Sequence, residues 1–203
     1  AAYLARAGKK VLILERRHVL GGAAVTEEIF PGFKFSVCSY VVSLLKANVI
    51  RELELPQFGL EILPLESTFT PLDSDYLFRT SDADQTYREI YRHSPKDADT
   101  YNRFGPLMGQ IGMAVRPILE TIAPNIQRPS IADLISLKKI LKHVKSLSNE
   151  HLEYLCKLMT MSSADFLDEW FEFEPLKASM SASGIIGTFM GPRSPGSAYV
   201  MLH

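Results

Sequence analysis

The sequence predicts an α/β fold that continues into a mainly helical region, and three observations lead to this prediction. A continuous aliphatic run from Val11 to Leu14 follows a helix-forming segment, which is typical of a strand buried in a parallel sheet. From Asp82 onward the pattern changes to amphipathic helices with polar caps. The 203 residues are 46% hydrophobic with a formal net charge of −1, which suits a globular protein with a sizeable core.

The first fifteen residues read as a helix followed by a strand. Residues 1–7 have helix-forming composition, and Gly8 stands where a C-terminal capping glycine is expected. Residues 9–15 are then predicted to form a strand that is buried on both faces. A helix that enters a parallel strand crosses over from an earlier strand. We therefore expect the chain to begin inside a βαβ unit, with its first strand and glycine-rich loop missing, and to be cut at its C-terminus as well.

Short elements of mixed type are expected next. The sequence predicts extended pieces within residues 29–42 around the turn Pro31-Gly32, and a short helix at residues 47–55 ended by Pro56. Three further strands are predicted, at residues 60–65, 68–71 and 76–79. The mixed pattern ends near residue 66. We place a domain boundary there, between residues 1–66 and residues 67–203.

The second region is predicted to be helical because polar caps stand before apolar stripes. The cap-to-acid spacing occurs at Ser94 with Asp97, at Ser130 with Asp133, and at Ser162 with Asp165. The first helix carries an apolar stripe at Tyr101, Phe104, Met108, Ile111, Val115, Ile118 and Ile122. The second helix is expected to bury Leu134, Leu137, Leu141 and Val144.

Other features of these helices have structural interpretations. Pro106 and Pro117 are expected to kink or break the first helix. Tight packing is expected beside these prolines, at Gly105, Gly109 and Gly112. The aromatic residues around Trp170 are predicted to be core, and the lysines from Lys138 to Lys145 a solvated face.

Residues 8–26 hold the candidate chemistry. In dinucleotide-binding βαβ units an acid at the end of the second strand accepts hydrogen bonds from ribose hydroxyls, and Glu15 holds that position. The pair Gly21-Gly22 begins six residues later, and such a pair lets the backbone approach a pyrophosphate without Cβ clashes. Arg17 can supply positive charge near phosphate. A plain tight turn and a solvated arginine are the alternatives for these residues.

The spacing from Gly8 through Glu15 and Arg17 to Gly21-Gly22 resembles the second-strand signature of the FAD-binding amine oxidase and phytoene desaturase superfamily. Within it, the chain is most similar to a phytoene-dehydrogenase-like subgroup, through residues 15–28, 31–36, 94–98 and 195–199. The resemblance implies a discontinuous, incomplete FAD-binding Rossmann-like domain joined to a mainly helical α+β substrate domain. It further implies a cofactor-binding set made of Glu15, Arg17, Gly21, Gly22 and Ala23.

The implied function is an FAD-dependent oxidoreductase that removes hydride from an apolar or amphipathic organic substrate, with no catalytic side chain assigned. Two departures keep alternatives open: Ala23 replaces a usual arginine, and Ser36 to Cys38 replaces a frequent Asp-x-Gly. A non-catalytic interaction protein and a carotenoid desaturase or isomerase are the alternatives. A lone NAD-binding domain is disfavoured, because the glycine pair after the acid belongs to the FAD signature. The 203 residues alone are expected to be inactive and not to hold FAD stably.

Composition limits the other partners. The near-neutral charge argues against nucleic acid, which usually needs a basic patch. No apolar run is long enough for a transmembrane helix, and the histidines lack metal-site spacing. Cys38 and Cys156 fit reduced thiols. We expect a small-molecule substrate and a cytoplasmic location, or the mitochondrial matrix in a eukaryote, and leave the oligomeric state open.

Overall fold

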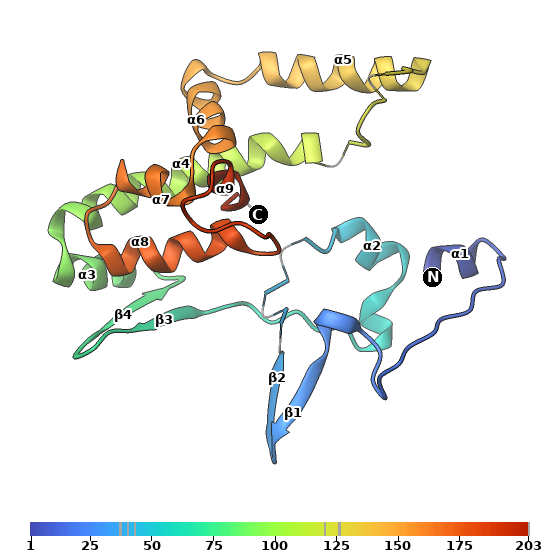
Figure 1. Ribbon diagram of the computed structural model, residues 1–203, viewed down its shortest axis with the longest axis horizontal. Helices are drawn as coiled ribbons and strands as arrows, with labels where there is room; N and C mark the ends of the chain where they lie inside the picture. The colour runs from blue at the N-terminus through green and yellow to red at the C-terminus, as the bar shows by residue number, and fades with distance from the viewer. Residues whose placement is uncertain (37, 40, 43, 120, 126, 203) are drawn as a thin grey trace. The chain divides into compact units, whose positions relative to one another are not determined.

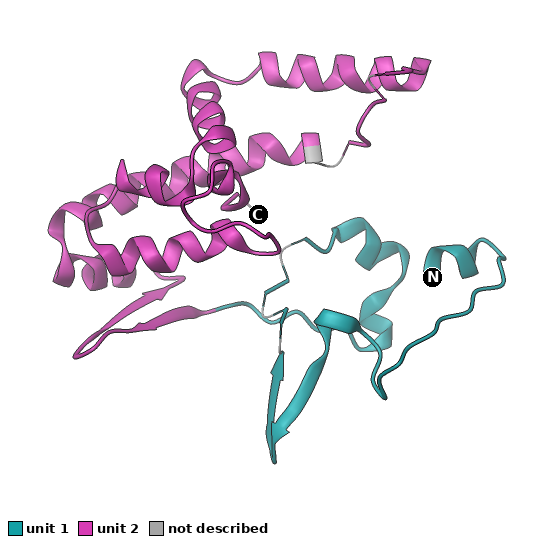
Figure 2. Ribbon diagram, in the orientation of Figure 1, with its two compact units in different colours: residues 1–65 teal, residues 66–203 magenta. Residues whose placement is uncertain are grey.

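The computed structural model describes the chain (Figure 1) except at Val37, Tyr40, Ser43, Glu120, Ile126 and His203. The described residues divide into two compact units, residues 1–65 and residues 66–203 (Figure 2). The smaller unit contains short helices, one β-hairpin and long irregular segments. The larger one contains a second hairpin and a group of helices that share an aromatic core.

Helix α1 (Ala2–Arg6) ends at the predicted glycine cap. Gly8 has a φ of +74°, which a residue with a Cβ rarely adopts. The N–H of Gly8 donates to the Ala5 carbonyl at 2.9 Å, and the N–H of Lys9 donates to the Leu4 carbonyl at 3.0 Å. This pair of bonds is a Schellman motif, so the predicted helix end is confirmed.

The predicted strand at residues 9–15 is not formed. The structure describes this segment as irregular, and no β-ladder partner occurs for it among the described residues. Leu12 and Leu14 are 81% and 85% exposed, where burial on both faces was expected. The predicted strand at residues 60–65 is irregular as well. Both predictions were wrong for the same reason. An apolar run indicates that its side chains favour burial, but a strand forms only where a neighbouring strand pairs with its backbone N–H and C=O groups.

A β-hairpin follows, made of β1 (Thr26–Phe30) and β2 (Phe33–Ser36). The strands pair antiparallel, with Thr26 opposite Ser36. At the turn, Gly32 has a φ of +84°, and its N–H donates to the Glu28 carboxylate at 2.9 Å. The expected extended pieces around Pro31-Gly32 are confirmed here, while the part of that prediction at Val37 and Tyr40 lies outside the described residues.

Helix α2 (Ala47–Glu52) is shorter than predicted. The chain enters a 3₁₀ turn, η2 (Leu55–Phe58), that contains Pro56 near its start. A residue before proline is disfavoured in the α conformation, which explains why the helix stops before Leu55. Helix α1 is tied to α2, because the Tyr3 hydroxyl donates to the Glu52 carboxylate at 2.8 Å.

The larger unit begins with the predicted strands β3 (Ser67–Pro71) and β4 (Tyr76–Thr80), which pair antiparallel. Helix α3 (Ala83–His93) follows, and the Asp82 carboxylate caps its first turn by accepting backbone N–H groups of Asp84 and Gln85. Leu77 of β4 and Ile90 of α3 are both fully buried. The hairpin is therefore held against the helical core through α3.

Arg92 of α3 joins the helix to the start of β4. Its guanidinium donates to the Asp75 carboxylate at 2.6 Å, to Glu89 at 2.7 Å and to the Tyr76 carbonyl at 2.8 Å. The hydrogen bonds from Arg92 lower the pKa of both Asp75 and Glu89 below their ordinary values. A carboxyl with a lowered folded-state pKa stabilises the fold above its unfolded-state pKa, and this contribution is lost as pH falls through the folded-state value.

Replacing Arg92 with alanine is therefore expected to have an effect that depends on pH. At pH 7 the variant should unfold at lower urea concentration than the wild type, because two ionised carboxylates lose their shared partner. The difference should begin to shrink once pH falls below about 4, where these carboxyls are protonated in the unfolded chain, and should vanish below their lowered folded-state pKa values. Urea titrations of both proteins across this range test the prediction. A difference that stays constant with pH would contradict it.

Helix α4 (Pro95–Leu119) begins as predicted, since the Ser94 Oγ accepts the N–H of Asp97 at 3.2 Å. It continues through Pro106 and Pro117, where a kink or break was expected. Its buried side, led by Phe104 and Ile111, is fixed by tertiary packing. Such packing contributes most of a helix's stability in a protein and outweighs the hydrogen bonds lost at the prolines.

Two expectations on α4 fail at particular positions. A Cβ added to Gly105 or Gly109 would meet no heavy atom within 4 Å, so these glycines are not sites of tight packing. One added to Gly112 would lie 3.9 Å from the Leu202 carbonyl, an ordinary contact. Ile122, the last residue of the predicted stripe, lies beyond the helix and is 89% exposed. The stripe therefore ends earlier than the sequence predicts.

The described residues that follow form the helices α5 (Ile131–Lys145), α6 (Asn149–Thr160), α7 (Ser163–Asp168), α8 (Glu174–Ser181) and α9 (Ser197–Val200), with a 3₁₀ turn η3 (Ala182–Ile185) before α9. The predicted caps are confirmed at α5, where Ser130 and Asp133 form a capping box, and at α7, where Ser162 caps. Within the described residues, no helix is long and apolar enough to cross a membrane.

The core of the larger unit lies where α4 meets α7 and the start of α8. The Phe104 ring packs edge-on against Phe171 and Trp170, with centroids 5.1 Å and 5.2 Å away. Phe166 is fully buried beside them. The predicted aromatic core is confirmed. The predicted burial of α5 is wrong, because Leu134, Leu137 and Leu141 are all exposed.

Candidate functional site

Glu15 stands at the end of the exposed apolar run that follows α1. Its carboxylate accepts the backbone N–H of Arg17 at 2.9 Å, at the start of a bend that covers residues 16–20. The side chain is exposed, so its other oxygen is open to solvent or to a ligand. A carboxylate has lone pairs for several donors and can accept two neighbouring hydroxyl groups.

The glycine pair forms a tight turn at the start of η1 (Gly22–Ala24). Gly21 has a φ of +132° and Gly22 a φ of +58°, and both values favour glycine strongly. The Ala24 N–H closes the turn by donating to the Gly21 carbonyl at 3.1 Å. Val25 is buried and holds the end of the turn, so the segment has a defined backbone path.

Arg17 is engaged within its own unit. Its guanidinium forms an ion pair with the Glu27 carboxylate at the start of β1. This pair connects the segment after Glu15 to the hairpin. In this structure the Arg17 guanidinium, which was expected to lie beside a phosphate, is therefore paired with Glu27.

These residues fit a dinucleotide in their chemistry. A Cβ on Gly22 would meet nothing within 4 Å, so a ligand can approach that backbone closely, and one on Gly21 would lie 3.2 Å from the Val25 side chain. Ala23 follows in the same turn and adds only a methyl group. Among the described residues, no hydrogen bond joins Glu15 to the glycine pair. The structure thus shows Glu15 and the glycine pair as separate features. Their common role in binding a cofactor stays a prediction.

Of the buried polar residues of the larger unit, sequence reasoning named Asp97 only as a helix-cap acid and did not single out Ser163 or Ser197. Asp97, Ser163 and Ser197 are fully buried and hydrogen bonded. The Asp97 carboxylate accepts the backbone N–H of Phe173 at 2.8 Å, and the Ser197 Oγ accepts that of Ser163 at 2.8 Å. Their partners are distant in sequence, so only the cap position of Asp97 signalled a role. These contacts hold loops and helix ends together.

The N-terminal unit is similar to a known protein family. Residues 1–53 match the family described as NAD(P)-binding Rossmann-like domain. That match covers Glu15 and the glycine pair. The N-terminal segment is therefore similar to a Rossmann-like nucleotide-binding domain, although the described residues form no parallel sheet.

The whole chain matches pyridine nucleotide-disulfide oxidoreductase domain-containing protein 2 from Rattus norvegicus, at 37% identity over 219 aligned positions. The protein of the same name from Mus musculus matches equally, at 37% identity. The chain is similar over its whole length to these oxidoreductase-domain proteins. The alignment covers 100% of this chain and 38% of each relative, so the chain spans well under half the length of these curated relatives.

A more distant match links the chain to a dehydrogenase. A limonene dehydrogenase polypeptide from Castellaniella defragrans is 40% identical over 103 residues, which cover 49% of this chain and 19% of that protein. No solved structure matches the chain. The relatives support a general redox function and agree with the oxidoreductase class that the sequence predicts.

Proposed function

We propose that the protein is an FAD-dependent oxidoreductase of the phytoene-dehydrogenase-like kind, which removes hydride from an apolar or amphipathic organic molecule. The observation that carries the proposal is the acid-to-glycine-pair segment, Glu15 to Gly22, inside a chain that is similar to an oxidoreductase-domain protein over its whole length. Because the chain covers 38% of that relative, the proposal concerns the activity of the complete gene product.

Each residue of the set has a distinct task in this proposal. Glu15 accepts the ribose hydroxyls of the adenosine half, for which its exposed carboxylate is suited. Gly21 and Gly22 let the backbone approach the pyrophosphate, and Ala23 leaves room beside it. Arg17 either turns toward phosphate or keeps the loop on the hairpin through Glu27. When bound, FAD would supply the redox chemistry, and the protein supplies position and electrostatics.

The two units have separate roles in this proposal. Residues 1–66 form part of a discontinuous FAD-binding domain, and residues 67–203 form most of a substrate domain inserted into it. The mainly helical composition of the larger unit supports the second assignment, because an apolar substrate requires an apolar wall. No catalytic side chain is assigned.

The absorption spectrum of the purified complete gene product tests the proposal. We expect flavin bands in the wild type and their loss after dialysis of Glu15→Ala. Affinity for FAD should fall roughly tenfold to a hundredfold, because hydrogen bonds to a charged acceptor are lost. Glu61→Ala is the matched control, since Glu61 is an exposed acid of the same unit. It should keep its flavin.

Different outcomes separate the alternatives. A colourless protein that FAD cannot reconstitute would overturn the proposal, and binding of NAD(P) alone would point to a nicotinamide-binding domain. A yellow protein whose flavin no reductant or substrate bleaches would favour the non-catalytic interaction protein. Bleaching by polyenes would favour a carotenoid desaturase or isomerase.

A further inference from the structure

Helix α5 presents an apolar face that nothing covers in the described structure. Ile131 is 79% exposed, Leu134 and Ile135 are each 53% exposed, and Leu141 is 52% exposed. With Leu137, they account for most of the large apolar side chains of the helix. An exposed stripe of this length on one helix marks an interaction site rather than a core element.

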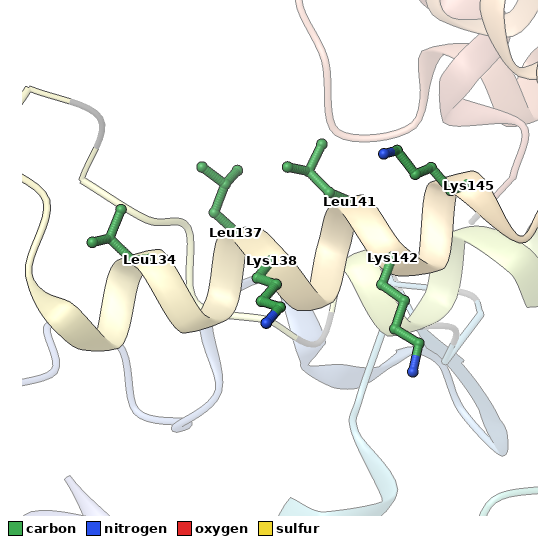
Figure 3. A pocket seen from close by; sticks show the side chains of 6 residues that line it. All are labelled: Leu134, Leu137, Lys138, Leu141, Lys142 and Lys145. Atoms are coloured by element: carbon green, nitrogen blue, oxygen red, sulfur yellow. The ribbon is translucent and has the colours of Figure 1, made fainter.

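Lysines lie within this stripe, because at 3.6 residues per turn Lys138 and Lys142 fall between the leucines and Ile135 on the helix surface. Leu134, Leu137 and Leu141 lie along one side of α5 and Lys138 and Lys142 project from the adjoining side, as Figure 3 shows. Lys145 completes the lining of the same open groove, and Lys139 is exposed nearby. We call the groove-lining residues, together with Ile131 and Ile135, the α5 face.

Negative charge is nearly absent from the helix. Asp133 is its acidic residue, and its carboxylate is engaged in the N-terminal capping box, where it accepts the N–H and Oγ–H of Ser130 at 2.8 Å and 2.7 Å. The whole chain has a net charge of −1, so the positive charge belongs to this helix and not to the protein as a whole. The α5 face therefore combines apolar and cationic groups.

The inner side of α5 is anchored to the unit. The His143 Nε2 donates to the Ala114 carbonyl of α4 at 2.5 Å, while Ile140 and Val144 are half-buried. The capping box defines the start of the helix. The α5 face is thus presented outward on a formed helix.

We propose that the α5 face binds an anionic lipid surface. A helix with leucine and isoleucine on its outer side and lysines beside them suits the interface, where apolar side chains enter the acyl boundary and ammonium groups reach phosphate. Each lysine near an anionic surface adds to the attraction. The inference is independent of the proposed redox function.

The positive charge of the α5 face argues against a second copy of this chain as its binding partner. Two α5 faces packed together would bring Lys138, Lys142 and Lys145 of both copies close to one another, and like charges at an interface disfavour association. The face also lies on a single helix and lacks the deep pockets between elements that anchor protein hot spots. A broad, fluid, negatively charged partner fits these features best.

Co-sedimentation of the complete gene product with lipid vesicles tests the inference. One set of vesicles is phosphatidylcholine alone, and the other is phosphatidylcholine mixed with phosphatidylglycerol. The wild type should bind the anionic vesicles more tightly and lose this preference at high salt. A wild type that stays in the supernatant with both vesicle types overturns the inference.

Paired variants locate the binding surface. Lys138→Gln with Lys142→Gln should weaken binding to anionic vesicles roughly tenfold or more. Leu134→Gln with Leu141→Gln should weaken binding to both vesicle types. The controls are Lys10→Gln and Met113→Gln, which change an exposed lysine and an exposed apolar residue elsewhere. They should bind as the wild type does.

Two further results would count against a lipid surface. If the α5 variants bind vesicles normally while a control loses binding, the surface lies elsewhere. If the wild type forms a concentration-dependent dimer that Leu134→Gln with Leu141→Gln abolishes, the occupant is a second copy. Glutamine has good helix propensity, so each variant should keep its helix content. Circular dichroism checks this.

Discussion

Replacing Asp97 with alanine is expected to lower the free energy of unfolding of the larger unit by about 3 kcal/mol. Asp97 is fully buried at the third position of α4, where its carboxylate accepts the N–H of Glu172 at 3.1 Å and that of Phe173 at 2.8 Å. These groups precede α8, so one side chain joins the starts of two helices. Alanine would leave both donors without their acceptor and open a cavity at the carboxylate.

Urea unfolding followed by fluorescence measures this effect. Trp170 is the single tryptophan of the chain and packs in the core of the larger unit, so its emission reports on that unit. Asp133→Ala is the matched control, because Asp133 holds the same helix position in α5 but is only half-buried. Its loss of stability should be much smaller. Equal effects of the two substitutions would show that Asp97 acts only as a helix cap.

Gly184→Ala is expected to destabilise the same unit by about 3 kcal/mol, through overpacking. A Cβ at this buried glycine in η3 would lie 2.7 Å from the Ser163 Cβ and 2.9 Å from the Ser197 carbonyl oxygen. The second atom is backbone, so it cannot turn away as a flexible side chain would. Relief would require η3 to move from α7 or from the start of α9.

The control for Gly184 is a glycine with free space around it. Gly109 lies within α4, and an added Cβ there meets nothing within 4 Å. Gly109→Ala should therefore stabilise the unit by roughly 0.5–1 kcal/mol, since alanine is the better helix former. The same fluorescence titration measures both variants. A destabilised Gly109→Ala with a neutral Gly184→Ala would reverse the expected order and contradict this packing.

Local signals predicted the elements of this chain well where one residue decides the backbone. Gly8 ends α1, Ser130 begins α5 and Ser162 begins α7, because glycine geometry and serine capping act over a single turn. The extended pieces around Pro31-Gly32 also followed from turn residues. Such signals need no knowledge of the rest of the molecule.

Predictions that depended on distant partners fared worse. The run Val11–Leu14 and the α5 stripe both indicate burial, yet both are exposed in this structure. An apolar pattern fixes which side chains require cover and leaves the covering element unspecified. Pro106 shows the opposite effect, since packing of Phe104 and Ile111 overrides a local signal to break the helix.

The candidate site follows the same rule: its local sequence pattern could be recognised, but its contacts with distant residues could not be predicted. Glu15 and the pair Gly21-Gly22 were recognisable because an acid and two glycines at fixed spacing carry a mechanism. The ion pair of Arg17 with Glu27 was not, because nothing in the spacing shows which acid the hairpin brings to the arginine. Their joint role as a cofactor site stays a prediction for the spectrum to test.

The exposed aliphatic segment Val11–Leu14 also affects how this polypeptide behaves during synthesis. Four aliphatic side chains in a row, with no ladder partner among the described residues, form a template onto which any second apolar strand can add. An uncovered apolar stretch of this kind is open to self-association and to capture by chaperones during synthesis. Lys9 and Lys10 immediately before it act as gatekeepers, because their like charges oppose the stacking of one copy on another.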